Sequence, residues 1–291
     1  MRWTKVDNSD DVIDVRAAGR SGIPGGRVAV PGGIGLIGVI VILALQLLGG
    51  SSALYDVPSG LDGQAAAVQS APLPATEDPD LTLKDFSVAV FTDVQAMWSE
   101  LFSASSITYQ RAKLVLYSGA VRSGCGSASS AVGPFYCPAD NRVYLDLSFQ
   151  RQMRSELGAD GDFAWAYVIA HEMGHHAQNQ LGTDAQVRDL VARDPGKAGD
   201  LSVRQELQAD CYAGVWAQRA YKAGALEPGD IDEALGAAAA VGDDTIQKKA
   251  TGRIDPDSFT HGSSEQRSRW FNQGYSSGDA DSCDTFSPDS V

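Results

Sequence analysis

Two histidines and a glutamate near the middle of the chain have the spacing of a zinc-binding helix. Residues 170–178 read Ala-His-Glu-Met-Gly-His-His-Ala-Gln and contain the pattern His-Glu-x-x-His at His171, Glu172 and His175. Side chains four positions apart on a helix lie about 5–6 Å apart on one face, so both imidazoles can reach a single Zn²⁺. Glu172 is rotated about 100° around the helix axis from His171. It can therefore lie beside the metal and hold the metal's water instead of binding the metal itself.

This short pattern also occurs by chance in ordinary helices, so other features of the chain must agree with it. His176 faces away from the side formed by His171 and His175, and we interpret it as a core histidine or one that supports a ligand. Asp162 is suited to cap the helix and Gly182 to end it. The motif is therefore predicted to lie on a helix over residues 162–182.

A second helix is predicted to supply the third metal ligand. Ser202 fits an N-terminal cap and Gly224 a C-terminal stop, and Glu206 and Asp210 lie one turn apart between them. A catalytic zinc needs a third protein ligand, which Glu206 can supply, and an open fourth position. Asp210 can accept the second ring N–H of His171 and so fix the tautomer of that ligand. The alternative is an exposed helix with two acids at i and i+4, where like charges repel slightly.

The remaining histidine, His261, and Arg267 six residues later could assist a reaction at the metal. Hydrolysis of a peptide at zinc passes through a tetrahedral oxyanion, which preorganised side-chain donors can stabilise. His261 is the only histidine outside the motif, and Arg267 is a permanent cation. Either of them could reach the oxyanion or a substrate carbonyl. The alternative is a histidine at the start of a helix and a surface arginine.

The four cysteines predict two disulfides. None of them forms a Cys-x-x-Cys pair, which argues against a zinc ribbon. An even number of cysteines favours disulfides in an extracytoplasmic domain, and four cysteines allow three pairings. We favour Cys125–Cys137, which closes a local loop, together with Cys211–Cys283, which ties the C-terminal segment to the second helix. Four free thiols are the alternative.

Residues 28–48 carry no charge and form the longest apolar segment of the chain. As a helix, this segment is long enough to cross about 30 Å of hydrocarbon. Arg16, Arg20 and Arg27 precede it closely, and the next basic residue after it is Lys84. This asymmetry predicts a single-pass protein of the cell membrane with a cytoplasmic N-terminus and an extracytoplasmic main domain. A cleaved signal peptide and a buried core helix are the alternatives.

The apolar segment divides the chain into four predicted parts. Residues 49–80 are rich in Gly, Ser, Ala, Pro and Asp, which is typical of a flexible linker. The parts are a cytoplasmic arm over residues 1–27, a transmembrane anchor over 28–48, the linker over 49–80 and an extracytoplasmic catalytic domain over 81–291. The net charge of −14 argues against a nucleic-acid-binding protein.

The hydrophobic patterning of residues 81–291 predicts an α+β domain, mainly helical, with a small β-sheet. Steps of three and four predict a helix over residues 83–102, and a further helix should run from residue 230 to about 249. Residues 113–117 and 141–149 read as strands. Residues 143–149 are the candidate edge strand that receives substrate as an added strand, and an ordinary sheet strand is the alternative.

These segments together resemble the bacterial neutral zinc metallopeptidase family, a group of membrane-anchored peptidases, over about residues 83–286. The matching motifs are Gly133-Pro-Phe-Tyr-Cys-Pro-Ala-Asp, Val143-Tyr-Leu-Asp-Leu, Ala170-His-Glu-Met-Gly-His-His-Ala-Gln, Gln205-Glu-Leu-Gln-Ala-Asp-Cys and Thr260-His-Gly-Ser-Ser-Glu-Gln-Arg. The wider pattern is similar to that of the gluzincins, where a glutamate on the second helix completes the metal site. The resemblance implies a zincin-like fold, zinc ligands at His171, His175 and Glu206, and a catalytic Glu172.

The segment that carries His261 and Arg267 is similar to one in the membrane CAAX prenyl proteases and their quality-control relatives. In those proteins the corresponding histidine and arginine assist the transition state, which implies catalytic roles for both residues here. This sequence has Gly262 where those relatives have proline. The local backbone is therefore expected to differ.

We expect a membrane-anchored, zinc-dependent endopeptidase in which a zinc-activated water attacks a peptide bond and Glu172 is the general base. Zn²⁺ is the expected cofactor, and a protein or peptide is the expected substrate. The membrane is a further expected partner, through the N-terminal anchor, and nucleic acid is not one. The first alternative is a non-enzymatic extracytoplasmic module that keeps zinc for structure and binds envelope proteins or peptides. The second is a zinc hydrolase that acts on a non-peptide amide.

Overall fold

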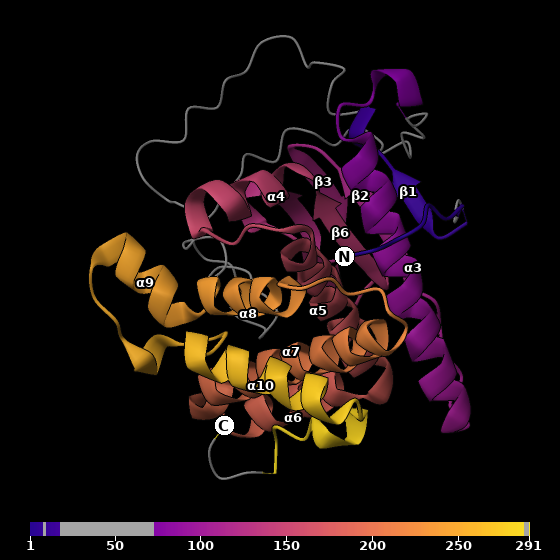
Figure 1. Cartoon of the computed structure of the whole chain (residues 1–291). Helices are drawn as coiled ribbons and strands as arrows, with labels where there is room; N and C mark the ends of the chain where they lie inside the picture. Colours follow the sequence, from indigo (N-terminus) through magenta and orange to yellow (C-terminus); the bar gives the residue numbers. More distant parts are fainter. Residues whose placement is uncertain (8–9, 18–72, 288–290) are drawn as a thin grey trace, which may run out of the picture.

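In the computed structural model, which describes residues 1–7, 10–17, 73–287 and 291, most of the chain is helical and a small sheet lies at one end (Figure 1). The strands are β1 (Val12–Asp14), β2 (Lys113–Tyr117), β3 (Ala120–Ser123), β4 (Gly126–Ser129), β5 (Phe135–Cys137) and β6 (Arg142–Asp146). The helices are α3 (Leu81–Ala104), α4 (Ser148–Gln152), α5 (Asp162–Leu181), α6 (Thr183–Arg193), α7 (Ala198–Lys222), α8 (Asp230–Ala240), α9 (Asp243–Thr251) and α10 (Ser264–Ser277). The mainly helical α+β character predicted from the sequence is present.

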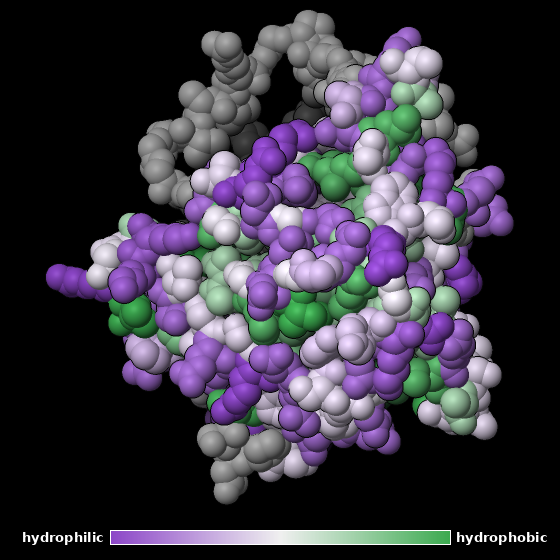
Figure 2. All heavy atoms as spheres, in the orientation of Figure 1, coloured by the Kyte–Doolittle hydropathy of each residue, from purple (hydrophilic) through white to green (hydrophobic). Residues whose placement is uncertain are grey.

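The hydrophobic core lies between the sheet and the helices, and α5 passes through it (Figure 1). Its largest fully buried side chains include Trp98 of α3, Trp165 of α5 and Trp216 of α7. The face shown in Figure 2 is mostly hydrophilic, with hydrophobic side chains in small patches between polar ones. Among the described residues, no helix combines the length and the apolar character that a membrane crossing needs. The predicted anchor at residues 28–48 lies outside them.

The predicted substrate strand, β6, lies in the interior of the four-stranded sheet. The strand order is β1-β2-β6-β5, in which β1, β2 and β6 are parallel and β5 is antiparallel to β6. Because β6 pairs with β2 along its whole length and with β5 from Arg142 to Tyr144, most of its backbone is already paired. The strand also ends at Asp146, and α4 begins at Ser148. The edge strand at this end of the sheet is β5, which contacts α5.

Neighbouring residues fix both ends of α5, the helix that carries the motif. Gly161 precedes it with φ 109°, and the N–H of Phe163 donates to the Glu233 carboxylate of α8 at 3.0 Å. Glu233 therefore caps the helix in place of the predicted Asp162, which is the first helical residue and accepts instead from the α-amino group of Met1. At the other end, Gly182 follows the helix with φ 83°, so the predicted stop is confirmed.

Glycines allow α7 to approach α5 and α10 closely. A Cβ atom on Gly174 of α5 would lie 3.1 Å from the backbone of Ala209 in α7. A Cβ atom on Gly274 of α10 would lie 1.9 Å from the carbonyl oxygen of Cys211, so alanine there would force the two helices apart. These contacts place α5, α7 and α10 side by side at the level of the motif.

Two predicted helix boundaries differ from the structure. Helix α7 begins at Ala198, before Ser202. The Ser202 hydroxyl instead donates to the backbone carbonyl of Thr260, in the segment before α10. The single helix predicted from residue 230 to 249 is two helices, because α8 ends at Ala240 and α9 begins at Asp243. Gly242 lies at the break, where a Cβ atom would be only 2.4 Å from the backbone nitrogen of Ser264. The break directs Asp243 toward the segment that precedes α10.

The described residues 1–7 and 10–17, here called the N-terminal arm, pack against the body formed by residues 73–287. Strand β1 of the arm adds to β2 as a parallel neighbour at the edge of the sheet. Beyond β1, the side chain of Arg16 is 3% exposed, and its guanidinium lies 2.7 Å from Asp14 and 2.5 Å from Asp78. Asp78 belongs to the segment that leads into α3. The arm is thus fastened by backbone pairing and by a buried ion pair.

This packing differs from the predicted domain boundaries, which separated a cytoplasmic arm over residues 1–27 from the domain over 81–291. The α-amino group of Met1 also contacts the body, where it donates to Asp162 at 2.7 Å. In this structure the described arm packs on residues 73–287, whereas the predicted topology places the two on opposite sides of a membrane. A three-residue strand carries too short a pattern to reveal such packing from sequence.

Both disulfides favoured from the sequence are present. Cys125–Cys137 joins the β3–β4 turn to β5, and Cys211–Cys283 joins α7 to the C-terminal segment. All four cysteines are therefore paired, and none is free.

Candidate metal centre

The three side chains predicted as zinc ligands converge between α5 and α7. His171 and His175 come from α5 and Glu206 from α7, and their ligand atoms all lie within 4.8 Å of one another. His171 Nε2 is 3.2 Å from Glu206 Oε2, and His175 Nε2 is 3.5 Å from Glu206 Oε1. Two atoms that bind zinc tetrahedrally at about 2.0–2.1 Å lie about 3.3 Å apart. The two separations are therefore close to those of a tetrahedral zinc site.

The second ring nitrogen of each histidine is held by an acceptor, which leaves both Nε2 atoms for the metal. His171 Nδ1 donates to Asp210 Oδ1 at 2.8 Å, as predicted from the helical spacing. His175 Nδ1 donates to Gln178 Oε1 at 2.8 Å, a contact that the sequence analysis did not predict. Because carboxylate and carbonyl oxygens only accept, each Nδ1 carries the proton and each Nε2 keeps the lone pair that a metal needs. Two neutral imidazoles and one carboxylate are a donor set that suits Zn²⁺.

The negative charges of Asp210 and Glu206 favour a cation at the candidate centre. Burial opposes the charge of His171, but the carboxylates of Asp210 and Glu206 raise its pKa to about 10. Burial also opposes the charge of Glu206, whereas His175 and His171 hold its pKa well below the usual range. The carboxylates of Asp210 and Glu206 thus favour a positive charge at this place, which a bound metal would supply.

Glu172 lies beside the ligands without belonging to the set. It is 8% exposed, and burial raises its pKa against the opposing charges of His171 and His175. The backbone N–H of Tyr136 in β5 donates to its carboxylate and acts in the same direction as the two histidines. A carboxylate whose pKa is raised toward neutral pH suits a general base. The contact with Tyr136 also places β5 next to the candidate centre.

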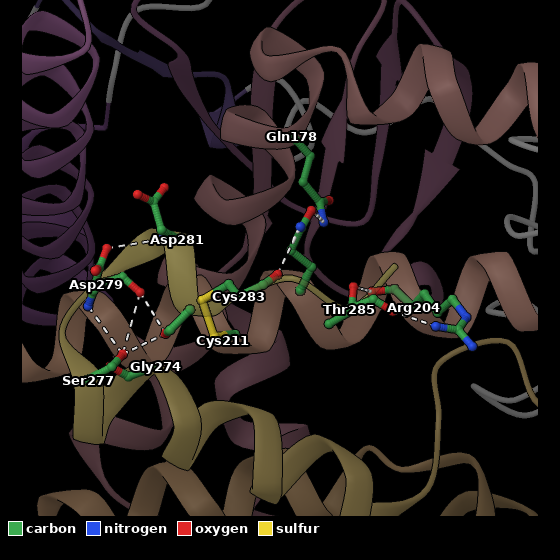
Figure 3. Close-up of a disulfide and its surroundings, with 11 residues drawn as sticks. Gln178, Arg204, Cys211, Gly274, Ser277, Asp279, Asp281, Cys283 and Thr285 are labelled. Carbon is green, nitrogen blue, oxygen red and sulfur yellow. Dashed lines mark hydrogen bonds between the residues drawn. A yellow bond between two sulfur atoms is a disulfide. The ribbon is translucent and has the colours of Figure 1, made fainter. Parts of the chain in front are cut away.

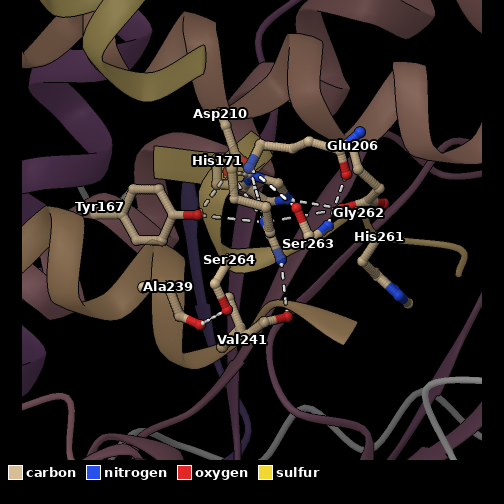
Figure 4. A network of polar contacts seen from close by, with 12 residues as sticks. Tyr167, His171, Glu206, Asp210, Ala239, Val241, His261, Gly262, Ser263 and Ser264 are labelled. Carbon is tan, nitrogen blue, oxygen red and sulfur yellow. Dashed lines mark hydrogen bonds and ion pairs between the residues drawn. The ribbon is translucent and has the colours of Figure 1, made fainter. Parts of the chain in front are cut away.

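Arg267 belongs to a buried network with Tyr167, His171 and Asp210, three residues that Figure 4 shows close together. It is 4% exposed, and it donates through Nε to Asp210 Oδ2 at 2.8 Å and through Nη2 to Asp210 Oδ1 at 3.0 Å. Tyr167 joins the network, because its hydroxyl donates to Asp210 Oδ1 at 2.5 Å and accepts from Arg267 Nη2 at 3.2 Å. Arg267 holds Asp210, which in turn accepts from His171, and Arg267 Nη2 also lies 3.9 Å from Glu206 Oε2. Its role at the oxyanion stays a prediction.

The ring of His261 is held by Asp243 at the start of α9. His261 Nδ1 lies 3.3 Å from Asp243 Oδ1 and 2.9 Å from Thr260 Oγ1. Asp243 Oδ2 accepts from the backbone N–H groups of Thr260, His261 and Gly262, which fixes the loop as well as the ring. His261 is also near enough to Glu206 for its charge to lower the pKa of that carboxylate. The loop that carries His261 lies near Glu206 (Figure 4), and Asp243 is a partner that sequence reasoning missed.

The backbone next to His261 has a conformation that proline cannot adopt. Gly262 has φ 88°, whereas proline is fixed near about −65°. The expected difference from the relatives that have proline at this position is therefore present. A Cβ atom on Gly262 would also lie only 3.2 Å from Leu207 of α7.

His176, the third histidine of the motif, is part of the core. It is 0% exposed, and its two ring nitrogens lie 3.0 Å from the Tyr136 hydroxyl and 2.8 Å from the Gln110 carbonyl. Burial lowers its pKa to about 4, so the ring is neutral at neutral pH. The interpretation of His176 as a core histidine is confirmed.

Comparisons with known proteins agree with this geometry. Residues 1–286 match the family described as "Putative neutral zinc metallopeptidase", a range that includes the N-terminal arm. The uncharacterized protein YpfJ of Escherichia coli K12 is 45% identical over 289 residues, which cover 98% of this chain and 99% of YpfJ. The uncharacterized protein Rv2575 of Mycobacterium tuberculosis H37Rv is 48% identical over 211 residues, or 69% of each chain. No solved structure matches the chain. The chain therefore belongs to the neutral zinc metallopeptidase family.

Proposed function

We propose that this protein is a zinc-dependent endopeptidase. The observation that carries the proposal is the size of the ligand set: among the described residues, two imidazoles and one carboxylate converge, and no fourth ligand joins them. A structural zinc usually has four protein ligands, whereas a catalytic zinc keeps one position for water or substrate. Glu172, buried beside this set but outside it, is the group that hydrolysis additionally needs.

The residues around the centre divide the chemical work. A bound zinc ion would supply Lewis acidity, which lowers the pKa of water toward 7 and polarises a carbonyl group. Glu172 would accept the proton of the attacking water and pass it to the leaving amine. His261, with its ring held by Asp243, would donate a hydrogen bond to the carbonyl oxygen as negative charge develops there.

The network behind the centre keeps the ligands in the form that binds metal. Asp210 accepts from His171 Nδ1 and so holds the tautomer whose Nε2 is free. Two parallel hydrogen bonds from Arg267 fix the Asp210 carboxylate in turn. Neither residue needs to contact the substrate in this mechanism.

A peptide is the proposed substrate, and β5 is the proposed docking strand. Among the described strands, β5 pairs with β6 alone, so no described strand occupies its other edge, where we propose that an extended chain binds. The N–H of Tyr136 on this strand already donates to Glu172, so a peptide beside β5 would run past the general base. The proposal moves the docking strand from β6 to its neighbour.

We also propose that the arm and the body share an extracytoplasmic compartment. Two disulfides favour an oxidising environment for the body. The arm packs on that body through β1 and Arg16, so a cytoplasmic arm would have to give up both contacts. The apolar residues 28–48 remain the proposed membrane attachment.

Replacement of Glu172 by Gln tests the catalytic proposal. We expect Glu172→Gln to keep zinc and to lose at least about a hundredfold in activity, because the general base is removed while the ligands remain. Cleavage sites identified by proteomics with the wild-type protein and the variant, together with metal content of both, give the measurement.

Glu265→Gln, an exposed position on α10, is the matched control and should behave as the wild type. Wild-type turnover by Glu172→Gln would remove this residue from the mechanism. A zinc-loaded wild-type protein that cleaves nothing would instead favour a binding module that keeps the metal for structure.

A further inference from the structure

The orientation of His175 depends on an amide that has no freedom to turn. Gln178 is 0% exposed, and its Oε1 accepts from His175 Nδ1 at 2.8 Å. Its Nε2 donates to the backbone carbonyl of Gln205 at 2.7 Å and to Gln208 Oε1 at 3.0 Å. Exchange of the two amide atoms would break all three hydrogen bonds. The candidate ligand His175 is therefore held in place from α7 as well as from its own helix.

Gln208 extends this dependence to the C-terminal segment. Its Oε1 is used by Gln178, and its Nε2 donates to the backbone carbonyl of Cys283 at 3.0 Å. Gln208 is itself 8% exposed, so a lost partner could not easily be replaced by water. Figure 3 shows Gln178 and the Cys211–Cys283 disulfide, and the two hydrogen bonds of Gln208 connect Gln178 to the Cys283 carbonyl.

The carbonyl of Cys283 is fixed by covalent and polar tethers. Cys283 forms its disulfide with Cys211 of α7, 72 positions earlier in the chain. Two residues further on, the Thr285 hydroxyl donates to the carbonyl of Arg204 and the Arg204 guanidinium donates to the carbonyl of Thr285, each at 2.7 Å. Residues 283–285 belong to no helix or strand, so these tethers determine where the carbonyl lies.

We propose that Gln178 and Gln208 are positioning residues that connect the metal ligand His175 to the Cys211–Cys283 disulfide, so that this disulfide supports zinc affinity. The path runs from His175 through Gln178 and Gln208 to the Cys283 carbonyl, and every link is a hydrogen bond of 3.0 Å or less. The inference rests on the zinc centre of the proposed function, but not on peptide hydrolysis.

Zinc affinity, measured by competition with a chelator, tests the proposal directly. Gln178→Leu should lower the affinity about 10–100-fold, and Gln208→Leu and the double variant Cys211→Ser/Cys283→Ser should each lower it about tenfold. The absorption spectrum of the Co²⁺-substituted protein should change in all three, because it reports ligand geometry. A residue that only stabilised the fold would shift the melting temperature and leave this spectrum unchanged.

Matched controls separate the path from general damage. Gln218→Leu removes a glutamine of the same helix that donates to Ser276 instead, and Cys125→Ser/Cys137→Ser removes the other disulfide. Both should keep the zinc affinity and the Co²⁺ spectrum of the wild type.

A double-mutant cycle supplies the decisive comparison. If the path is correct, Gln208→Leu adds little in the protein that already lacks Cys211–Cys283, because both changes break the same connection. Additive losses of zinc affinity would overturn the proposal. Wild-type zinc affinity in Gln208→Leu would also overturn it. This single variant keeps the disulfide, so it tests the path even if the double serine variant does not fold. A wild-type protein that binds no zinc would overturn the proposed function as well, whereas equal affinity in wild type and variants overturns this inference alone.

Discussion

A buried arginine joins carboxylates both at the metal centre and in the N-terminal arm, but the two arginines serve different ends. At the centre, Arg267 holds Asp210, and the same carboxylate holds the candidate ligand His171. In the arm, Arg16 bridges Asp14 of the arm and Asp78 of the body. One pair orients a group that does chemistry, and the other fastens one part of the chain to another. Loss of Arg267 should therefore lower zinc affinity, whereas loss of Arg16 should release the arm from the body.

The largest effect is expected at the centre. Arg267→Leu should lower the free energy of unfolding by about 3–5 kcal/mol, because it leaves Asp210 buried without its cation. Zinc affinity should fall about 10–100-fold, since His171 loses its fixed partner. Denaturant unfolding of the metal-free protein and chelator competition measure the two quantities.

Arg269→Leu, an exposed arginine on the same helix, is the control and should change neither quantity appreciably. One outcome would support the role that the resemblance implied for Arg267, which is to assist the transition state. If Arg267→Leu kept both stability and zinc affinity while kcat alone fell, Arg267 would act on the reacting carbonyl and not through Asp210.

Most residues of the metal centre could be predicted from the sequence because they lie at helical spacing within α5 or within α7. His171, Glu172 and His175 share one turn of α5, and Glu206 and Asp210 share one turn of α7. Their partners on other elements were not readable in the same way. The side chain of Gln178 was overlooked although it lies inside the motif, because its value comes from contacts with α7.

The arm shows more clearly where sequence reasoning ends. Arg16 was counted as one of the basic residues that precede an apolar segment, and charge asymmetry alone then placed it in the cytoplasm. Its contact with Asp78 spans 62 positions, and no periodic pattern connects them. For the same reason Asp243 was missed, since only the break after α8 brings it to His261. Contacts within one helix can be predicted from residue spacing, whereas contacts between distant segments depend on the whole fold.

A smaller effect is expected when the arm is released. Arg16→Leu should lower the free energy of unfolding by about 3 kcal/mol, at the lower end for a broken buried pair, because Asp14 keeps a contact with Lys84 at 2.9 Å. Zinc affinity should stay at the wild-type value, and limited proteolysis should cut the arm faster. Lys5→Ala, which removes an exposed pair with Asp85, is the control and should cost less than about 1 kcal/mol.

The pH dependence of this variant shows whether the ion pair is the cause. Burial alone would raise the pKa of Asp14 and of Asp78, but Arg16 holds both below the usual range. Their contribution to stability is therefore present above the pKa of about 4 in the unfolded chain, and it is lost as the pH falls through that value toward the lower folded pKa. Arg16→Leu should flatten this acid dependence. An unchanged slope would mean that other carboxylates account for it.

The smallest expected effect concerns the compartment of the arm. A cysteine in the arm and a cysteine in the body should be labelled equally from outside the cell membrane. All four native cysteines are in disulfides, so Thr4→Cys in the arm or Ser103→Cys in α3 creates a single exposed thiol. A membrane-impermeant maleimide applied to cells with a permeabilised outer envelope should label both variants equally. Labelling of Ser103→Cys alone would place the arm in the cytoplasm, and β1 would then have to leave the sheet in the membrane-bound protein. Protection of both would keep the arm with the body but move the pair to the cytoplasm, where a reducing environment would work against the Cys211–Cys283 bond.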